Sequence, residues 1–378
     1  MKIIEAAWSG ARETLLAVLR TRPALMILVL AGFLYGFYYP AAYQHQVATR
    51  LPVVVVDLDQ SPASRRLTEF LLAAPQVNVL GVSRDFEAAR RLLQRREVDA
   101  IVLVPPDFER GLLSGSRPDA LAFYLNGAYL VRASAIGGAL QAVLQAALQE
   151  ALEGPARALG LQTLVPVKAV VHPLFNTREG YGSYVVPGVA VVIVHQTLLM
   201  GVVLLMGERR RRGLRFGSGA ELAGAGLAFA SIGLMTAFFY FGFVFWFQDY
   251  PRGGSVAAML LSSLLFVGAT VAFALFVGSF FDRGERSAQV LAASSALVFF
   301  LSGVPWPLDA MPPTLAMLTH LLPSTAGVQG LVKVNQMDAA LADVAPQLVE
   351  LAALLLGYGL LAWWRWTRQP HPSANPAR

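Results

Sequence analysis

Two aspartates one residue apart follow an apolar run early in the chain, in the stretch VVVVDLDQS at residues 53–61. Carboxylates can act as covalent nucleophiles, as general acids or bases, and as ligands for Mg²⁺. Asp57 and Asp59 are therefore the first side chains to test for catalytic chemistry. The alternative is structural, because Asp59 or Ser61 could cap a helix that begins near Pro62.

The stretch is similar to the signature of haloacid-dehalogenase-like phosphatases. There the first aspartate attacks a phosphoryl group and the second acts as acid/base beside Mg²⁺. Such an enzyme also needs a downstream lysine and further acidic metal ligands. The whole chain has three lysines, Lys2, Lys168 and Lys333, and no Gly-Asp-x-x-x-Asp pattern follows residue 61. A membrane-anchored hydrolase is therefore disfavoured, and we expect no catalytic or metal site, but strand-end and helix-cap chemistry at 57–61.

The composition indicates a membrane protein. Of the 378 residues, 56% are hydrophobic and 14% are charged, whereas soluble domains carry about 25% charged residues. The chain has no cysteine, which excludes disulfides, thiolate metal sites and cysteine nucleophiles. Its net charge of +6 lies in short clusters beside apolar stretches, so we expect a lipid bilayer and no nucleic acid as partner.

A helix needs about 20 apolar residues to span a bilayer. The segment 310–332 is uncharged but contains Pro312, Pro313 and Pro323. We therefore expect short interfacial or re-entrant helices near 308–330, because a lipid-exposed span cannot leave broken backbone hydrogen bonds unsatisfied. Six other segments qualify as spans, and the last contains one acid, Glu350: 23–49, 180–207, 222–248, 253–281, 287–308 and 345–364.

The flanks of these spans differ in charge. One set contains 14 basic and 6 acidic residues, including the run GERRRRGLR at 207–215, whereas the opposite short loops are mainly acidic. Positive residues favour the cytoplasmic side. The sequence thus predicts a multi-pass protein of the bacterial inner (cytoplasmic) membrane with both termini, including the tail 367–378, in the cytoplasm.

Residues 1–22 precede the first span, 23–43. Ile4, Trp8, Ala11, Leu15 and Leu19 have helical spacing and predict an amphipathic helix on the cytoplasmic leaflet; the alternative is an N-terminal extension of the span. The apolar core of this span is longer than the 7–15 residues of a signal peptide. We therefore expect an uncleaved anchor.

Residues 44–180 alternate strand and helix patterns and predict an extracytoplasmic α/β domain inserted between the first two spans. The remaining spans occupy 181–366. The fold class is thus a mainly α membrane protein with six transmembrane helices and an inserted α/β domain. The insert's expected strands are 53–57, 77–82, 99–105, 120–126 and 165–173, and its expected helices are 62–74, 85–97, 106–115 and 129–158.

Four stretches in order carry a family resemblance: VVVVDLDQSPASRRLTEFL, REVDAIVLVPPDFERGLLSG, LFNTREGYGSYVVPGVAVVI and LSGVPWPLDAMPPTLAMLTHLLPSTAGVQGL. Together they resemble the permease subunits of type-2 (type V) ABC exporters, in the subgroup with a large periplasmic insert. The resemblance implies a dimer with a second copy or a paralogue, a separate ABC ATPase subunit, and in some systems a periplasmic membrane-fusion adaptor. The alternative is a non-ABC membrane protein whose outer domain binds a ligand or a partner protein.

ATP must be handled by another chain. A phosphate-binding loop needs a lysine directly after a glycine, and none of the three lysines has one. The chain itself is then a transporter subunit without enzymatic activity or cofactor, and ATP and Mg²⁺ belong to the partner subunit.

In the resembling family, a Gly-Thr-x-Glu element between spans two and three contacts the ATPase. Here residues 207–224 read GERRRRGLRFGSGAELAG, without Gly-Thr. By position, the candidate coupling residues are Glu208, Arg209, Arg210, Arg211 and Arg212. The alternative role of these arginines is to determine topology and to contact anionic lipids.

One dense polar cluster, His195, Gln196 and Thr197, interrupts the second span. It could form hydrogen bonds between helices or contact cargo along the transport path. The spans otherwise contain almost no acids or bases, which disfavours a proton relay. Their apolar, aromatic character favours a hydrophobic or amphipathic cargo.

Overall fold

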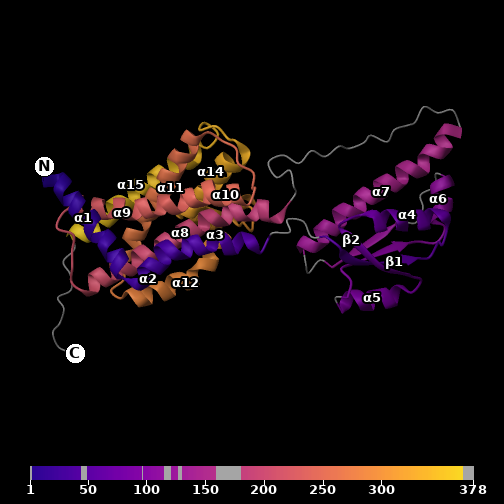
Figure 1. Ribbon diagram of the computed structural model, residues 1–378, viewed down its shortest axis with the longest axis horizontal. Helices are drawn as coiled ribbons and strands as arrows, with labels where there is room; N and C mark the ends of the chain where they lie inside the picture. Colours follow the sequence, from indigo (N-terminus) through magenta and orange to yellow (C-terminus); the bar gives the residue numbers. More distant parts are fainter. Residues whose placement is uncertain are drawn as a thin grey trace. The chain divides into compact units, whose positions relative to one another are not determined.

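The computed structural model describes residues 2–43, 49–95, 97–114, 121–126, 130–158 and 180–368. The chain divides into two compact units, shown in Figure 1. A membrane unit combines Met1–Gln44 with Pro173–Arg378, and an α/β unit comprises His45–His172.

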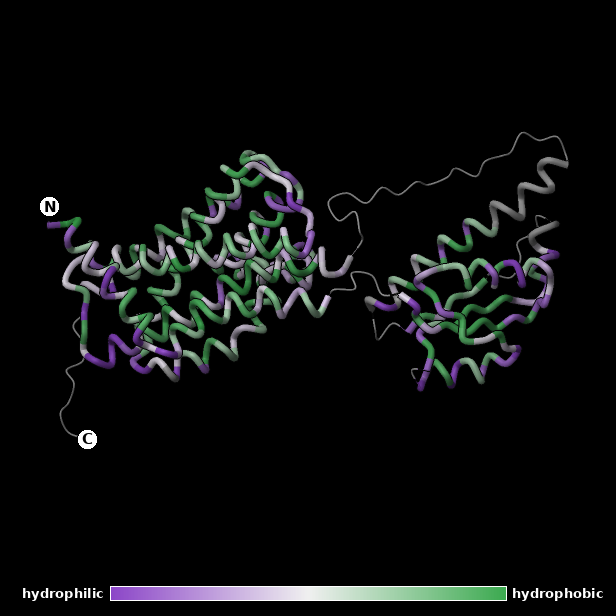
Figure 2. Tube along the Cα trace, in the orientation of Figure 1, coloured by the Kyte–Doolittle hydropathy of each residue, from purple (hydrophilic) through white to green (hydrophobic). Residues whose placement is uncertain are grey.

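The membrane unit is entirely helical in its described part. Hydrophobic residues cover most of the length of its helices, and hydrophilic residues gather in its loops (Figure 2). Its principal helices are α1 (Lys2–Arg20), α2 (Arg22–Leu25), α3 (Gly32–Ala41), α8 (Tyr181–Arg211), α9 (Gly219–Phe238), α10 (Phe245–Phe247), α11 (Val256–Gly278), α12 (Gly284–Leu301), α13 (Pro313–Thr319), α14 (Pro323–Met337) and α15 (Ala345–Arg368).

Five stretches are long and apolar enough to cross a membrane: Arg22–Ala41, Tyr181–Arg211, Gly219–Phe247, Val256–Gly278 and Ala345–Thr367. Short π-helical segments, η1 (Met26–Ala31) and η2 (Phe239–Val244), continue two of them. The predicted span 287–308 is shorter than expected, because α12 ends at Leu301. Its 18 helical residues reach about 27 Å at 1.5 Å per residue.

The proline-containing segment forms two helices, as its prolines predict. Pro323 opens α14, and Pro313 opens α13 after Pro312. The two helices meet at an angle of 82°, and the pair is apolar enough for either a broken span or a re-entrant loop. A short 3₁₀ turn, η3 (Leu308–Ala310), precedes them.

Helix α1 is separate from the first span. Thr21 has an extended backbone conformation, φ −101° and ψ 96°. It separates the end of α1 at Arg20 from the start of α2 at Arg22. The face of α1 with Gly10, Thr14 and Val18 is buried, because α1 packs along α9. Ile4 and Trp8 are 75% and 72% exposed on another face, as an amphipathic helix at a membrane surface requires.

Helix α8 is the centre of the membrane unit. In the most apolar 18-residue stretch of α8, 89% of the residues are buried, compared with 11% in that of α15. It packs against α11, α12 and α14. Residues in α8 therefore lie in protein surroundings, where polar groups need protein or ligand partners.

The α/β unit is built on a sheet of four described strands in the order β2-β1-β3-β4. Strands β1, β2 and β3 are parallel, and β4 pairs antiparallel with β3. The strands are β1 (Leu51–Asp57), β2 (Val77–Ser83), β3 (Ala100–Val104) and β4 (Ala122–Leu125), and the helices are α4 (Pro62–Ala73), α5 (Phe86–Gln94), α6 (Phe108–Ser114) and α7 (Leu130–Ala158).

Both faces of this sheet are covered. Val53 and Val55 of β1 pack with α4 and α7, whereas Val54 and Val56 pack with α5. Because side chains alternate along a strand, the unbroken valine run fits this burial on both faces. The strand predicted at 165–173 lies outside the described residues.

Candidate functional site

The aspartates of the opening stretch are structural. The Asp57 carboxylate accepts hydrogen bonds from the backbone N–H groups of Asp59 and Gln60, at 3.1 and 2.8 Å, and from the Ser64 hydroxyl at 2.8 Å. Its side chain is buried. Both carboxylate oxygens are thus engaged in holding the turn after β1 against α4, rather than free to attack a substrate.

The capping prediction is right for Ser61 and wrong for Asp59. The Ser61 hydroxyl accepts a hydrogen bond from the N–H of Ser64 and caps α4. The two oxygens of Asp59 instead accept hydrogen bonds from the N–H groups of Phe108 and Glu109, each at 3.1 Å, at the start of α6. Asp59 therefore joins the loop after β1 to the helix after β3. In the part of the chain that is described, no group of three or more His, Asp or Glu residues could hold a metal ion.

At the end of α8, the run of four arginines divides into two pairs. Arg211 donates to both oxygens of Glu208, at 2.8 and 2.7 Å, and Arg212 donates to one of them at 2.8 Å. The side chains of Arg211 and Arg212 are 59% and 64% exposed. Successive helical residues point about 100° apart, so the other two arginines of the run face elsewhere.

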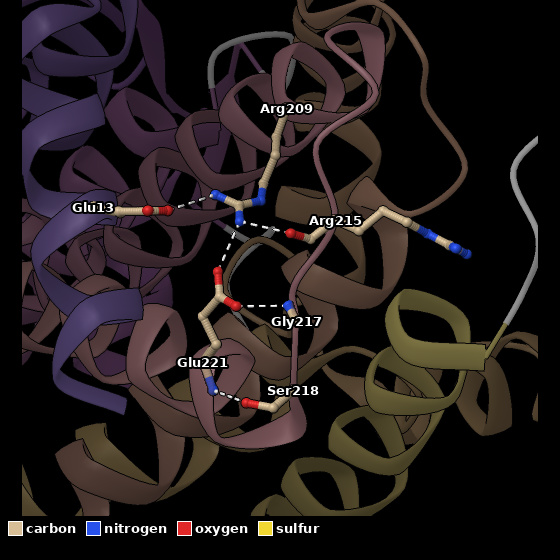
Figure 3. Close-up of polar contacts among 6 residues, drawn as sticks. All are labelled: Glu13, Arg209, Arg215, Gly217, Ser218 and Glu221. Carbon is tan, nitrogen blue, oxygen red and sulfur yellow. Dashed lines mark hydrogen bonds and ion pairs between the residues drawn. The ribbon is translucent and has the colours of Figure 1, made fainter. Parts of the chain in front are cut away.

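Arg209 is enclosed by the loop that follows its own helix (Figure 3). Its guanidinium donates to Glu221 and to the backbone carbonyl of Arg215, both at 3.0 Å, and to Glu13 of α1 at 3.4 Å. It also stacks over the ring of Phe216, 4.1 Å from the centroid. Its side chain is 16% exposed, and Arg209 ties α1, α8 and α9 together.

Glu221 and Ser218 close the same loop from the other side. The Ser218 hydroxyl accepts a hydrogen bond from the N–H of Glu221 at 3.2 Å, and the Glu221 carboxylate accepts one from the N–H of Gly217 at 2.6 Å. This reciprocal arrangement resembles a capping box, and it fixes the first turn of α9.

Arg210 faces a third direction. It donates a hydrogen bond to the backbone carbonyl of Ser279, directly after α11. Arg365 of α15 donates to the hydroxyl of the same serine at 2.6 Å and to its carbonyl at 3.3 Å. The loop's buried Phe216 packs on Trp366, 5.6 Å between ring centroids. These contacts bring α8, α11 and α15 together at the same end of the unit.

Two glycines let α1 approach α9 closely. A Cβ added at Gly10 would collide with the backbone carbonyl of Glu221, and one added at Gly224 would collide with the carbonyl of Ala7. Movement of the first turn of α9 would therefore press directly on the backbone of α1.

The part of this junction that remains on the surface comprises Arg211, Arg212, Leu214 and Arg215. Leu214 is 50% exposed, and the Arg215 side chain points away from the contacts drawn in Figure 3. Sequence reasoning did not single out Leu214 or the boundary between this loop and α9. The signal was the Ser-Gly-Ala-Glu capping pattern at 218–221, which marks the start of α9 and so separates the loop from the helix.

The polar cluster of α8 does not form the expected hydrogen bonds between helices. Thr197 donates within its own helix, to the carbonyls of Ile193 and Val194. His195 and Gln196 are buried, and neither has a hydrogen-bond partner among the described residues. The His195 ring instead lies over Phe273 of α11, with centroids 6.1 Å apart and planes 24° apart.

Comparison with known proteins agrees with this architecture. Residues 23–364 match the family described as "ABC-2 family transporter protein". The chain is 21% identical over 323 residues to the "Probable multidrug ABC transporter permease YbhR" of Escherichia coli strain K12, covering 84% of this chain and 86% of that protein. The protein of the same name from Escherichia coli O157:H7 matches equally. The family match rules out the non-ABC alternative.

The chain thus combines an apolar helical bundle with an inserted α/β unit whose paired aspartates form structural hydrogen bonds, and it matches this family over most of its length. It belongs to the ABC-2 family of transporter proteins, as a multi-pass membrane permease subunit that works with a separate ATPase subunit.

Proposed function

We propose that this permease exports a hydrophobic or amphipathic cargo from the cytoplasm or the inner leaflet of the bacterial inner membrane. It acts as a dimer with a second copy or a paralogue, and ATP and Mg²⁺ bind to the partner ATPase. The similarity to a protein named as a multidrug permease supports this cargo class. We also propose a periplasmic adaptor as a partner of this permease where the cargo must leave through the outer membrane.

The observation that carries the proposal is the junction at the end of α8. Segments predicted to be cytoplasmic meet there, since α1, the loop after α8, the end of α11 and the end of α15 are joined by Arg209, Arg210 and Arg365. This supports an arrangement in which α1 and the end of α15 lie on one side of the membrane, and we propose that this side is the cytoplasm.

The same junction suggests how ATPase movement reaches the spans. We place the ATPase contact on Arg211, Arg212, Leu214 and Arg215, three cations around an apolar side chain, a pattern suited to an acidic groove. Glu208 holds the first two arginines in position. Pressure on this surface would pass to α1 and α9 through Arg209 and Gly224, and to α11 and α15 through Arg210.

The test uses membrane vesicles that contain the full permease and its partner ATPase. Arg211→Gln with Arg212→Gln is compared with a matched double change, Arg283→Gln with Arg286→Gln, in another basic flank. Each exposed ion pair contributes about 0–1 kcal/mol. We therefore expect the first double variant to bind the ATPase up to tenfold more weakly and to lose cargo-stimulated ATP hydrolysis at normal abundance.

Glu208→Ala should have a smaller effect, because it leaves both arginines in place but less well oriented. Lower abundance of the Arg211/Arg212 variant, with unchanged ATP hydrolysis per folded complex, would instead assign these arginines to topology and anionic lipid. That result would contradict the coupling role.

A further inference from the structure

Six buried residues of the membrane unit have polar atoms with no hydrogen-bond partner in the described structure. They include both ring nitrogens of His195 and both amide heteroatoms of Gln196. Other hydroxyls of this unit donate to backbone carbonyls, as Ser231 and Thr236 do within α9 and Thr325 does to Leu301, so the six depart from that pattern. We call them the polar seam: His195, Gln196, Ser262, Ser263, Thr270 and Ser324.

The seam residues lie on three helices that pack against one another, α8, α11 and α14. On α11, Ser263 and Thr270 are seven residues apart, which places them on one face two turns apart. Phe266 and Phe273 lie on the same side. Phe273 stacks on His195 of α8. His195 therefore lies beside the face of α11 that carries the hydroxyls.

The third helix adjoins the same face. A Cβ added at Gly327 of α14 would collide with the ring of Phe266, and Ser324 lies one turn before Gly327. The face of α11 that carries the hydroxyls is thus the face on which both α8 and α14 pack. The seam is a shared feature of this three-helix contact and not a set of unrelated side chains.

Burying a polar atom without a partner costs folding free energy, and in a membrane interior water does not relieve that cost. A contact that only held helices together would be more stable with apolar side chains of the same size. The seam supplies hydroxyl, amide and imidazole groups that can both donate and accept, and no carboxylate. The described segments Tyr181–Gly207 and Val256–Gly278 contain no Asp, Glu, Lys or Arg, and the one such residue of α14, Lys333, lies nine residues after Ser324. A charged ligand would therefore find no counter-charge beside the seam hydroxyls.

We propose that the polar seam binds an uncharged, hydrogen-bonding group of the transported molecule, such as a hydroxyl or an amide, together with water, when α8 separates from α11 and α14. The phenylalanines on the same face of α11 would take the apolar part of that molecule. The identity of the ligand rests on the proposed export function. The accessibility of the site to water does not depend on it.

The absence of cysteine makes a direct test available. Ser263→Cys and Ser324→Cys are near-isosteric reporters. Ala269→Cys and Ala326→Cys are controls in the same two helices, and these alanines are 0% and 2% exposed. Maleimides react with thiolates, which form only where water reaches the thiol. With full-length permease in membranes, we expect N-ethylmaleimide to label the seam cysteines at least tenfold faster than the controls.

Three outcomes are decisive. Equal labelling of seam and control cysteines, with and without the partner ATPase and ATP, would overturn the site. Protection by octyl glucoside below its micellar concentration, without protection by an octyl ammonium salt, would support the uncharged ligand class; the reverse would overturn it. Seam labelling that persists while ATP-dependent export fails would refute the export proposal alone.

A second measurement separates this role from a structural one. Ser263→Ala should leave the melting temperature of the purified permease unchanged or raised, because it removes an unpaired hydroxyl, and should weaken protection of a cysteine at residue 324 by octyl glucoside at least threefold. A clear fall in melting temperature with protection unchanged would show that the hydroxyl serves packing, and would contradict the proposal.

Discussion

Arg210 of α8 and Arg365 of α15 donate hydrogen bonds to the same backbone carbonyl, that of Ser279 directly after α11. Two cations at a helix C-terminus interact favourably with its dipole, but they repel each other. Arg365 is also held by the ring of Phe280, 3.9 Å from its guanidinium carbon. Either arginine alone can therefore satisfy the carbonyl.

This sharing predicts a non-additive pair. Arg210→Gln should reduce the free energy of unfolding by less than about 1 kcal/mol, because Arg365 keeps the contact with the carbonyl. Arg365→Gln should cost more, since it also loses the Ser279 hydroxyl and the Phe280 ring. The double variant should lose more than the sum of the two. A double-mutant cycle on the purified permease, followed by thermal unfolding, measures the coupling. Strict additivity would show that the two arginines act separately.

Arg209→Gln should destabilise the membrane unit. It removes the ion pair with Glu221 and leaves that carboxylate, 18% exposed, without its charged partner. The expected loss is about 1–3 kcal/mol, seen as a lower melting temperature and lower abundance. Arg212→Gln, whose side chain is 64% exposed, is the control and should cost less than about 1 kcal/mol. A similar loss in both variants would argue against the division of the arginine run.

Gly224→Ala should separate α1 from α9, since the new Cβ would meet the carbonyl of Ala7. Overpacking of this kind costs about 1–3 kcal/mol. Gly359→Ala in α15 is the matched control. A Cβ there would meet nothing within 4 Å, and the substitution gives the same increase in helix propensity. Limited proteolysis in vesicles should release α1 from the first variant only. An equally protected α1 in both would place the tight crossing in doubt.

Asp59→Ala should loosen the start of α6 by about 0.5–2 kcal/mol, the usual effect of losing an N-terminal cap. Asp59→Asn keeps one acceptor oxygen and should lose less. Hydrogen exchange of the full-length protein would detect the change at the Phe108 and Glu109 amides, 49 and 50 residues away in sequence. Neither Asp59→Asn nor Asp57→Asn should change phosphate release, because we expect none. Metal-dependent phosphate release abolished by Asp57→Asn would reverse that interpretation.

Cysteines at Ala73 and Leu214 should label from opposite sides of the membrane. Both residues are exposed. Leu214 is a better reporter position than its neighbour Gly213, whose φ of +71° a cysteine adopts poorly. A membrane-impermeant thiol reagent should label the cysteine at residue 73 in intact cells, and the cysteine at residue 214 only after lysis. Labelling of both from outside would contradict the proposed orientation.

The sequence predicted the features that depend on local pattern. Uncharged stretches located the long spans, the valine run predicted a strand, and the prolines at 312, 313 and 323 predicted a break into short helices. Ser61 was one of two candidate caps, and its partner, Ser64, is three residues away. Such contacts follow from spacing alone.

Features that depend on distant neighbours were not predictable in this way. Asp59 reaches a helix about 50 residues later, and no spacing rule connects the two. The four arginines look alike in sequence, but the helical turn directs Arg209 and Arg210 towards other helices and leaves Arg211 and Arg212 at the surface. The sequence placed His195 in a polar cluster, but it could not show that the residue facing its ring on α11 is Phe273, which offers no hydrogen-bonding side chain.

The position of β1 has a consequence for biosynthesis. It is the first strand of its unit to be made, yet it lies between β2 and β3, and Val53 pairs with Ala100. At about 5–20 residues per second, ribosomes need on the order of seconds to supply the second neighbour. During that delay the uncharged segment LPVVVV, rich in β-branched residues, has an open edge of the kind that aggregates. The chain's demand for chaperone protection is therefore set by the order in which its strands emerge, and it should be greatest before residue 104 has been synthesised.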